Sequence, residues 1–269
     1  MKEVLKVAVS MVVAVTAVLA QEAEKAAQAV VAEERPDTGL SFDATMDVFS
    51  AYVWRGCVYN DEGVWQPAAN ISYATADYGS FGLGLWSNFD MKDNNRQVSG
   101  GGLNEIDYQL FYGIDLQDFS LEAGHYWYTF PKVNGRDYCE STREVYVSAA
   151  YNHELVTPFV SLTYDYAEYD GFYANAGLNK EFALSDQLTL GAEVSLGAGD
   201  DDYMDYLGMD DAGLMDFNAS VYTTFAVTDN VSVGAKLAWM SLLDSDARNV
   251  DLYNDKDILW GGITLNVAL

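Results

Sequence analysis

The sequence predicts an all-β protein: a transmembrane antiparallel up-and-down β-barrel of about twelve strands. From Leu40 onward, segments of about ten residues alternate apolar and polar side chains, so that each strand would have one apolar and one polar face. The connections between these segments are alternately short and long, as the short periplasmic turns and long extracellular loops of outer-membrane barrels are. After the N-terminal region no segment has the roughly 18–20 apolar residues of a spanning helix, so a closed barrel is the available way to cross a bilayer.

The N-terminal region has the pattern of a secretory signal peptide. Lys2 and Lys6 precede an apolar stretch over residues 7–19, which ends at a small residue, Ala20. The alternative is an uncleaved anchor. The Ala- and Glu-rich segment that follows predicts a periplasmic tether, with a plug inside the barrel as the alternative. The predicted organisation is a signal peptide over residues 1–20, a tether over 21–39 and a barrel over 40–269.

The strands are predicted from the alternation, with the apolar parity facing lipid and the polar parity facing the lumen. This places Tyr52 and Trp54 on the lipid face of the first strand. The phase is less clean around His125, where we expect a β-bulge near Gly124. The main alternative, a soluble secreted β-sandwich, also alternates but needs no matched series of apolar stripes with acids opposite. The predicted strands cover residues 42–54, 65–75, 81–90, 105–115, 119–130, 144–151, 160–166, 172–182, 188–196, 215–225, 231–239 and 263–269.

The composition is strongly acidic, with a formal net charge of −27. Nucleic acid is not an expected partner, because phosphate binding needs clustered Lys and Arg, whereas the field favours cations. The expected partners are outer-membrane lipid and lipopolysaccharide, small solutes and, during insertion, the barrel-assembly machinery. The C-terminal segment from Gly262 to Leu269 is similar to the terminal strand that this machinery recognises, with Leu269 in place of the usual aromatic residue.

The segment Ser50-Ala51-Tyr52-Val53-Trp54-Arg55-Gly56 resembles a hallmark of the TorF-type (Gcw) outer-membrane porin family. Gln66-Pro67-Ala68 and Gly84-Leu85-Trp86-Ser87-Asn88 are similar to later blocks of that family, and the resemblance covers most of residues 41–197. It implies an outer-membrane channel without catalytic residues. Cys57, directly after the Arg-Gly pair, departs from the family pattern, as do the acidic late loops.

The polar parity of the strands supplies the candidate lumen-lining residues, most of which are acidic. A wet lumen lined by them should favour cations, as acidic rings do in channels. Aromatic residues share this inward parity and would narrow the lumen: Phe49, Trp86, Phe111, Tyr146, Phe159, Tyr173, Tyr222 and Trp260. The charged candidates are Asp43, Asp47, Arg55, Asp90, Glu105, Asp107, Glu122, Glu144, Asp165, Glu193, Asp216 and Lys236.

Other chemistry has little support in the sequence. Cys57 and Cys139 both fall in expected outer loops and could form a disulfide or stay as thiols. The acidic loop over residues 198–213 could bind a divalent cation or simply be solvated. His125 and His153 have no arrangement typical of a hydrolase, and no cofactor or metal motif is present, so we do not expect an enzyme.

The predicted function is therefore a porin-like channel in the bacterial outer membrane for passive diffusion of small, preferentially cationic or neutral solutes. A closed structural or binding barrel with acidic surface loops is the alternative, and a barrel enzyme is the third reading. The sequence leaves open the solute, the width of the lumen and the oligomeric state.

Overall fold

The computed structural model describes residues 39–92, 102–131, 140–208, 211–245, 248 and 256–269. The predicted signal peptide and almost all of the predicted tether lie outside the described residues. Gly39, assigned to the tether, is the first residue of a barrel strand.

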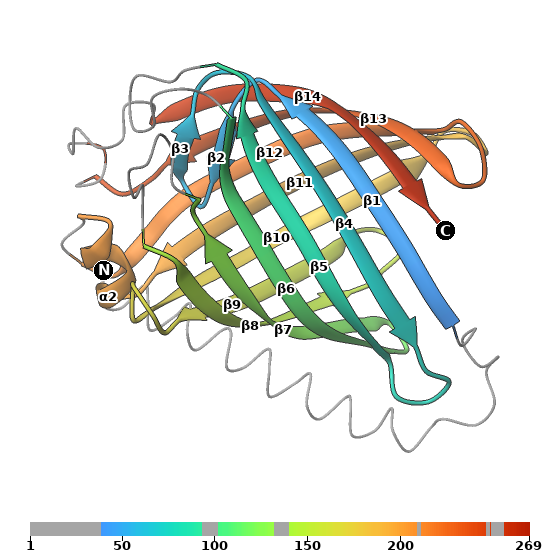
Figure 1. The fold of residues 1–269 in the computed structure, drawn as a ribbon, viewed down its shortest axis with the longest axis horizontal. Coiled ribbons are helices and arrows are strands. Elements are labelled where there is room, and N and C mark those ends of the chain that lie inside the picture. Colours follow the sequence, from blue (N-terminus) through green and yellow to red (C-terminus); the bar gives the residue numbers. More distant parts are fainter. Residues whose placement is uncertain (1–38, 93–101, 132–139, 209–210, 246–247, 249–255) are drawn as a thin grey trace.

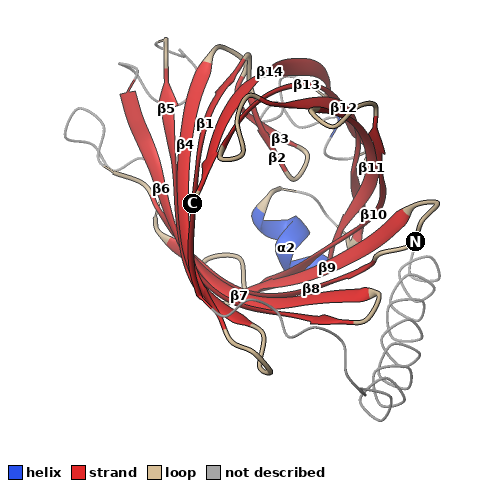
Figure 2. Ribbon diagram, turned by 90° about the vertical axis from the view of Figure 1, so that its right-hand side faces the viewer, coloured by secondary structure: helices blue, strands red, loops and turns tan. Residues whose placement is uncertain are grey.

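The described chain forms a closed antiparallel barrel, in which each strand pairs with the next along the chain and the last strand returns to the first (Figures 1 and 2). This confirms the predicted fold class and strand number. The barrel strands are β1 (Gly39–Phe49), β4 (Val64–Ala74), β5 (Ser80–Asp90), β6 (Gly102–Leu116), β7 (Phe119–Thr129), β8 (Thr142–Tyr151), β9 (Thr157–Asp165), β10 (Gly171–Ala183), β11 (Leu188–Gly199), β12 (Gly213–Ala226), β13 (Val231–Leu242) and β14 (Asp257–Ala268).

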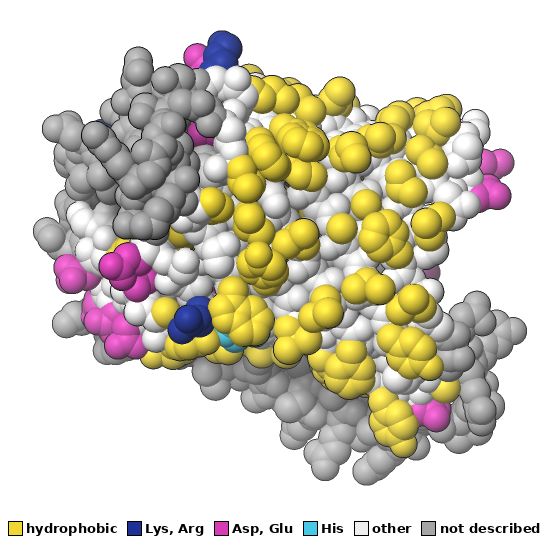
Figure 3. Space-filling model, in the orientation of Figure 1, with side chains coloured by type: hydrophobic (Ala, Val, Ile, Leu, Met, Phe, Trp, Pro, Cys, Tyr) yellow, Lys and Arg dark blue, Asp and Glu magenta, His cyan; other side chains and the backbone are white. Residues whose placement is uncertain are grey.

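Alternation along each strand separates the two faces of the wall, as β6 shows. Tyr108 and Leu110 point outward and are 46 % and 48 % exposed, whereas Asp107 and Gln109 between them line an internal cavity. Successive side chains of a strand must point to opposite faces, so the sequence pattern alone fixes this separation. Apolar side chains cover the strands on the face seen in Figure 3, and acidic side chains lie toward the two ends.

The two rims of the barrel carry different connections. Short turns join successive strands at residues 75–79, 117–118, 152–156, 184–187 and 227–230; we call this end the short-turn rim. Strand β1 begins there and Leu269 ends there, hydrogen-bonded to Phe42. The remaining connections form the opposite end, the long-loop rim.

The expected bulge near Gly124 was wrong. Gly124 pairs in continuous register with Phe111 on β6 and Tyr146 on β8. Register shifts occur instead at Asn88/Phe89 and Gly197/Ala198. Because the register is regular, His125 points outward, where it hydrogen-bonds the Tyr166 hydroxyl at 2.7 Å.

The first predicted strand is too long in one respect. The wall strand β1 ends at Phe49, and the chain then forms a separate hairpin of β2 (Tyr52–Trp54) and β3 (Cys57–Asn60). The hairpin lies inside the barrel (Figure 2). Tyr52 and Trp54 therefore face the lumen, and their prediction as lipid-facing residues was wrong.

The acidic connection between β11 and β12 also enters the barrel. It contains a short helix, α2 (Asp201–Tyr206), with Asp200 as its N-cap and with Tyr203 and Met204 buried. These side chains join a cluster of buried apolar residues inside the barrel: Cys57, Tyr173, Tyr203, Met204, Leu207, Met215 and Leu242. Among the described residues, no helix has the length and apolar character needed to cross a membrane.

Candidate functional site

The tip of the β2–β3 hairpin is a tight turn formed by Arg55 and Gly56. Trp54 pairs with Cys57 across it, and the two turn residues have φ angles of 45° and 75°. Two successive positive φ values are the requirement of a type I′ turn, which suits a two-residue hairpin. Gly56 adopts this conformation at no steric cost, whereas for Arg55 it costs about 1–2 kcal/mol. Contacts of the Arg55 side chain must therefore offset this strain.

Arg55 forms a bidentate ion pair with Glu144 on β8. Its Nη1 and Nη2 donate to the two carboxylate oxygens at 2.6 and 2.9 Å, and the Glu144 side chain is fully buried. The Tyr128 hydroxyl donates to the same carboxylate at 2.8 Å. Burial alone would lower the pKa of the Arg55 guanidinium, but its interactions with Tyr203 and Glu144 outweigh burial and raise that pKa well above its ordinary value. Arg55 therefore stays charged and fixes the hairpin to the wall.

Aromatic rings surround the same guanidinium. Its central carbon lies 4.1 Å from the Trp54 ring centroid and 4.7 Å from that of Tyr173 on β10. Tyr203 of α2 accepts a hydrogen bond from Arg55 at 3.3 Å, and burial raises the pKa of its hydroxyl. The backbone of α2 comes so close to Gly171 that a Cβ there would overlap Tyr203. Arg55 thus links the hairpin and the helix to each other and to two wall strands. We call β2, β3 and α2 together the luminal plug.

Several predicted lumen-lining acids are buried at fixed positions and do not face open water. Glu144, Asp165 and Asp216 are at most 1 % exposed. Asp165 accepts hydrogen bonds from Thr142 and from three backbone N–H groups of the following loop, so it organises that loop. Asp216 accepts from the Tyr173 hydroxyl at 2.9 Å. Sequence parity gives the face of a side chain but not what covers it.

The other charged candidates are distributed around the inner wall. Asp90 accepts from Asn88 and Asn104. Lys236 lies 5.3 Å from the Trp260 ring centroid. Single hydrogen bonds from inward side chains reach three more acids: Asn70 to Asp43, Tyr146 to Glu122 and Asn179 to Glu193. Within the described ranges Asp47 retains a buried carboxyl oxygen, Oδ1, without a hydrogen-bond partner. The structure gathers Glu105, Asp107, Glu144, Asp216 and Arg55 around the hairpin, with Asp216 beside Gly56 at its tip.

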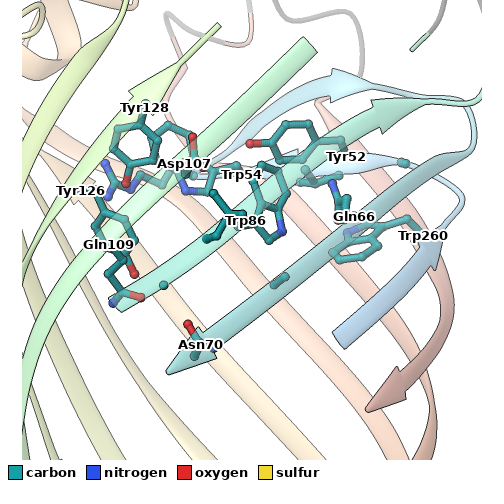
Figure 4. Close-up of a pocket in the computed structure, with 16 residues that line it drawn as sticks. Tyr52, Trp54, Gln66, Asn70, Trp86, Asp107, Gln109, Tyr126, Tyr128 and Trp260 are labelled. Atoms are coloured by element: carbon teal, nitrogen blue, oxygen red, sulfur yellow. The ribbon is translucent and has the colours of Figure 1, made fainter. Parts of the chain in front are cut away.

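A cavity of about 490 Å³ lies between the hairpin and a wall formed by β4 to β7, with Trp260 of β14 also lining it (Figure 4). Aromatic and amide side chains line most of it. Hairpin and wall rings meet at its edge, Tyr52 with Trp86 at 5.5 Å and Trp54 with Tyr128 at 5.7 Å between centroids. The alternation of β1 continues through Tyr52 and Trp54 and so concealed their luminal roles, although Gly56, which follows them, is a residue that favours a tight turn.

Inward aromatic rings cover glycines on neighbouring strands. A Cβ on Gly82, Gly124, Gly177 or Gly191 would overlap the ring of Phe111, Tyr146, Phe159 or Tyr222, respectively. These rings therefore lie flat against the wall, as in the pairing of an aromatic residue with a strand glycine. Large side chains can line the lumen in this way while projecting little into it.

The remaining sequence expectations have mixed outcomes. Cys57 is buried in the plug, and Cys139 lies outside the described residues, so their pairing stays a prediction. In the acidic loop Asp200 caps α2, and among the described residues no group of three or more metal-ligating side chains gathers. His125 faces outward and His153 lies in a short turn, so neither joins the inward acids.

Comparison with known proteins adds a family. Residues 33–249 match the family model described as "Bacterial protein of unknown function (Gcw_chp)", which confirms the family resemblance inferred from the sequence. No curated protein matches the chain.

Solved structures with a similar barrel share little sequence with this chain. The NanC porin is 12 % identical, with 85 % of this chain and 98 % of that chain covered and a TM-score of 0.49. The KdgM porin is 10 % identical over 84 % and 98 %, with a TM-score of 0.48. The COG4313 outer membrane channel from Pseudomonas putida F1 is 11 % identical over 88 % and 97 %, with a TM-score of 0.49. At these values the similarities carry no argument about function.

Proposed function

The chain belongs to the Gcw_chp family, and from its closed barrel we propose that it is a bacterial outer-membrane channel for passive diffusion of small cationic or neutral solutes. The observation that carries the proposal is a wall with an apolar outer face and a polar inner face. A soluble protein would leave few such apolar side chains in water, whereas lipid accommodates them.

The outer face supports insertion in a bilayer. On neighbouring strands, Leu83 and Leu85 are 58 % and 44 % exposed, beside Tyr108 and Leu110 of β6. The ring of strands has no open edge, because β1 pairs with both β4 and β14. In hydrocarbon every backbone N–H and C=O needs an internal partner, which a closed barrel provides.

The two rims support an orientation. Outer-membrane barrels have short turns on the periplasmic side and longer loops outside. In that orientation the short-turn rim, with the start of β1 and Leu269, faces the periplasm. The luminal plug then lies toward the external side, where it constricts the entrance.

The charge of the inner wall supports a preference for cations. Of the two basic candidates, Arg55 is occupied by Glu144, and Lys236 lies against Trp260. Acids such as Glu122 and Glu193 lie on the inner face and take part in none of the ion pairs among the described residues. A water-filled lumen with this excess of carboxylates concentrates cations.

Planar-bilayer recording tests the proposal. We expect steady conductance in potassium chloride. Across a salt gradient, we expect a reversal potential with the same sign as the equilibrium potential of potassium. A preference for chloride would contradict the cation-selective lumen. A correctly folded, inserted barrel that does not conduct would contradict the channel itself.

The luminal plug favours one second candidate, a closed binding barrel. The hairpin and α2 both occupy the lumen and are fixed there by Arg55. If the plug seals the passage, ligand binding on the external side would be the remaining activity. Conductance recordings separate the two, because only the channel gives single-channel steps.

A further inference from the structure

The cavity behind the hairpin contains a carboxylate without a full set of partners. Asp107 is 8 % exposed and lines the cavity, and its Oδ1 accepts no hydrogen bond from the described part of the chain. It sits in register between Trp86 on β5 and Tyr128 on β7. A buried carboxyl oxygen without a hydrogen-bond partner is costly, so a bound group that supplies one is favoured there.

The charges around Asp107 do not compensate it. Glu105 lies two residues away on the same face of β6 and is hydrogen-bonded to Tyr52. Among the described residues that line the cavity, Arg55 is the only basic one, and Glu144 already takes both ends of its guanidinium. The region therefore has one guanidinium beside three carboxyl groups, and Glu144 is the one that pairs with it.

Aromatic rings frame this carboxylate. Trp86 and Tyr128 flank it on the wall, and the hairpin brings Tyr52 against Trp86 and Trp54 against Tyr128. Figure 4 shows these side chains around the cavity, with Asp107 beside Tyr128 and Trp54. Ring faces attract organic cations electrostatically, and several rings around one anionic group form the usual site for an alkylated ammonium group.

The rest of the cavity is polar and neutral. The Trp260 indole N–H is buried without a hydrogen-bond acceptor among the described residues, and the amide oxygens of Asn70 and Gln109 both lie over Gly84. These groups fit a hydroxyl or carbonyl on the same ligand. The cavity volume of about 490 Å³ lies within the range of small-molecule pockets, about 300–1,000 Å³.

We propose that this cavity binds a small organic ammonium compound, with its cationic head against Asp107 and the ring faces and its polar end toward Trp260, Asn70 and Gln109. The inference rests on the proposed channel, because it names the class of solute that the lumen takes up. A neutral sugar could stack on the same rings, but it would bring no positive charge to the Asp107 carboxyl group. An anion would be opposed by that carboxyl group and by the negative faces of the rings.

Equilibrium titration of the full-length protein in detergent micelles tests the proposal, followed by calorimetry and by tryptophan fluorescence. The probes are choline, its uncharged isostere dimethylbutanol, and glucose. We expect choline to bind at least about tenfold more tightly than dimethylbutanol, the size of a desolvated cation–π contribution. Equal binding of choline and dimethylbutanol, tighter binding of glucose, or no binding of choline would overturn the proposal.

Matched variants locate the site. Asp107→Asn keeps the shape of the side chain and removes its charge, and we expect it to weaken choline binding by about tenfold or more. Trp86→Leu should weaken choline binding in the same way. Glu193→Gln removes an inward charge on β11, outside the cavity, and should leave binding unchanged. Equal effects of Asp107→Asn and Glu193→Gln on choline binding would show that choline responds to the electrostatic potential of the whole lumen. That result would overturn the proposed site.

The two proposals fail separately. Conductance in potassium chloride without choline binding would leave the channel intact and reject the ammonium site. Choline binding that Asp107→Asn abolishes, in a barrel that never conducts, would support the site within a closed binding barrel and reject the channel. Heat-dependent migration of each variant in gel electrophoresis checks that the barrel has folded.

Discussion

Arg55 at the tip of the luminal hairpin donates two hydrogen bonds to Glu144 on strand β8, at 2.6 and 2.9 Å. The pair joins a segment that has left the wall to the wall itself. Arg55 belongs to the hairpin and Glu144 to the barrel wall, so this ion pair helps to hold the hairpin in place.

Arg55→Ala should release the hairpin. The substitution leaves the Glu144 carboxylate buried and unpaired, which costs about 3–5 kcal/mol of folding free energy. We expect a lower midpoint of denaturant unfolding in detergent and a larger, noisier conductance. Lys92→Ala is the control, because the Lys92–Glu62 pair is exposed and surface ion pairs contribute little to stability. Unchanged conductance in Arg55→Ala would show that the hairpin does not limit flow.

Gly56→Ala should strain the same turn. Gly56 has φ of 75°, and an added Cβ would lie 3.0 Å from the Asp216 Cβ and 3.1 Å from Leu242. We expect about 1–3 kcal/mol of destabilisation, measured by denaturant unfolding. Gly213→Ala is the control, since Gly213 has an ordinary φ and no atom within 4 Å of an added Cβ. Equal stability of the two variants would reject the turn assignment.

Gly191→Ala should displace an inward ring. The added methyl group would overlap Tyr222, whose hydroxyl bonds Asn179 and Glu181 at 2.9 Å each. We expect a loss of about 1–3 kcal/mol, the usual cost of overpacking, and a change in single-channel conductance as the ring enters the lumen. Gly113→Ala, whose nearest contact would be 3.6 Å, should change neither.

Asp200→Ala should loosen α2. Asp200 Oδ1 accepts hydrogen bonds from the Tyr203 and Phe172 backbone N–H groups. Losing an N-cap costs about 1 kcal/mol, which in a helix this short should appear as faster amide hydrogen exchange in α2. Asp186→Ala, in an exposed short turn, serves as the control. Unchanged exchange in α2 would show that its packing against Gly171 holds it without the cap.

Much of the barrel could be predicted from the sequence, because the constraint is local. A strand such as β6, with Tyr108 and Leu110 alternating with Asp107 and Gln109, has its faces fixed by the chain itself. The long and short connections then give the topology. The family resemblance includes Arg55 and Gly56 in its hallmark segment, and the structure shows that these two residues form the tight turn of the hairpin.

The plug could not be predicted in the same way. Tyr52 and Trp54 continue the parity of β1, and an aromatic residue near a strand end has the same signature in a lipid interface as in a filled lumen. Tyr203 and Met204 are flanked in the sequence by aspartates, and so acidic a segment predicts a loop exposed to solvent. What decides their position is a partner distant in the chain, Glu144 for Arg55 and Gly171 for α2, and no local pattern records it.

The antiparallel seam between β1 and β14 has a consequence for biogenesis. Every other neighbouring pair in the wall joins segments that leave the ribosome in succession, but this seam matches Asp43 with Ala268. The cylinder therefore cannot close until β14 has been synthesised. Until then the edge strands have unpaired backbone N–H and C=O groups that must be protected from aggregation. A nascent chain lacking β14 would remain an open sheet.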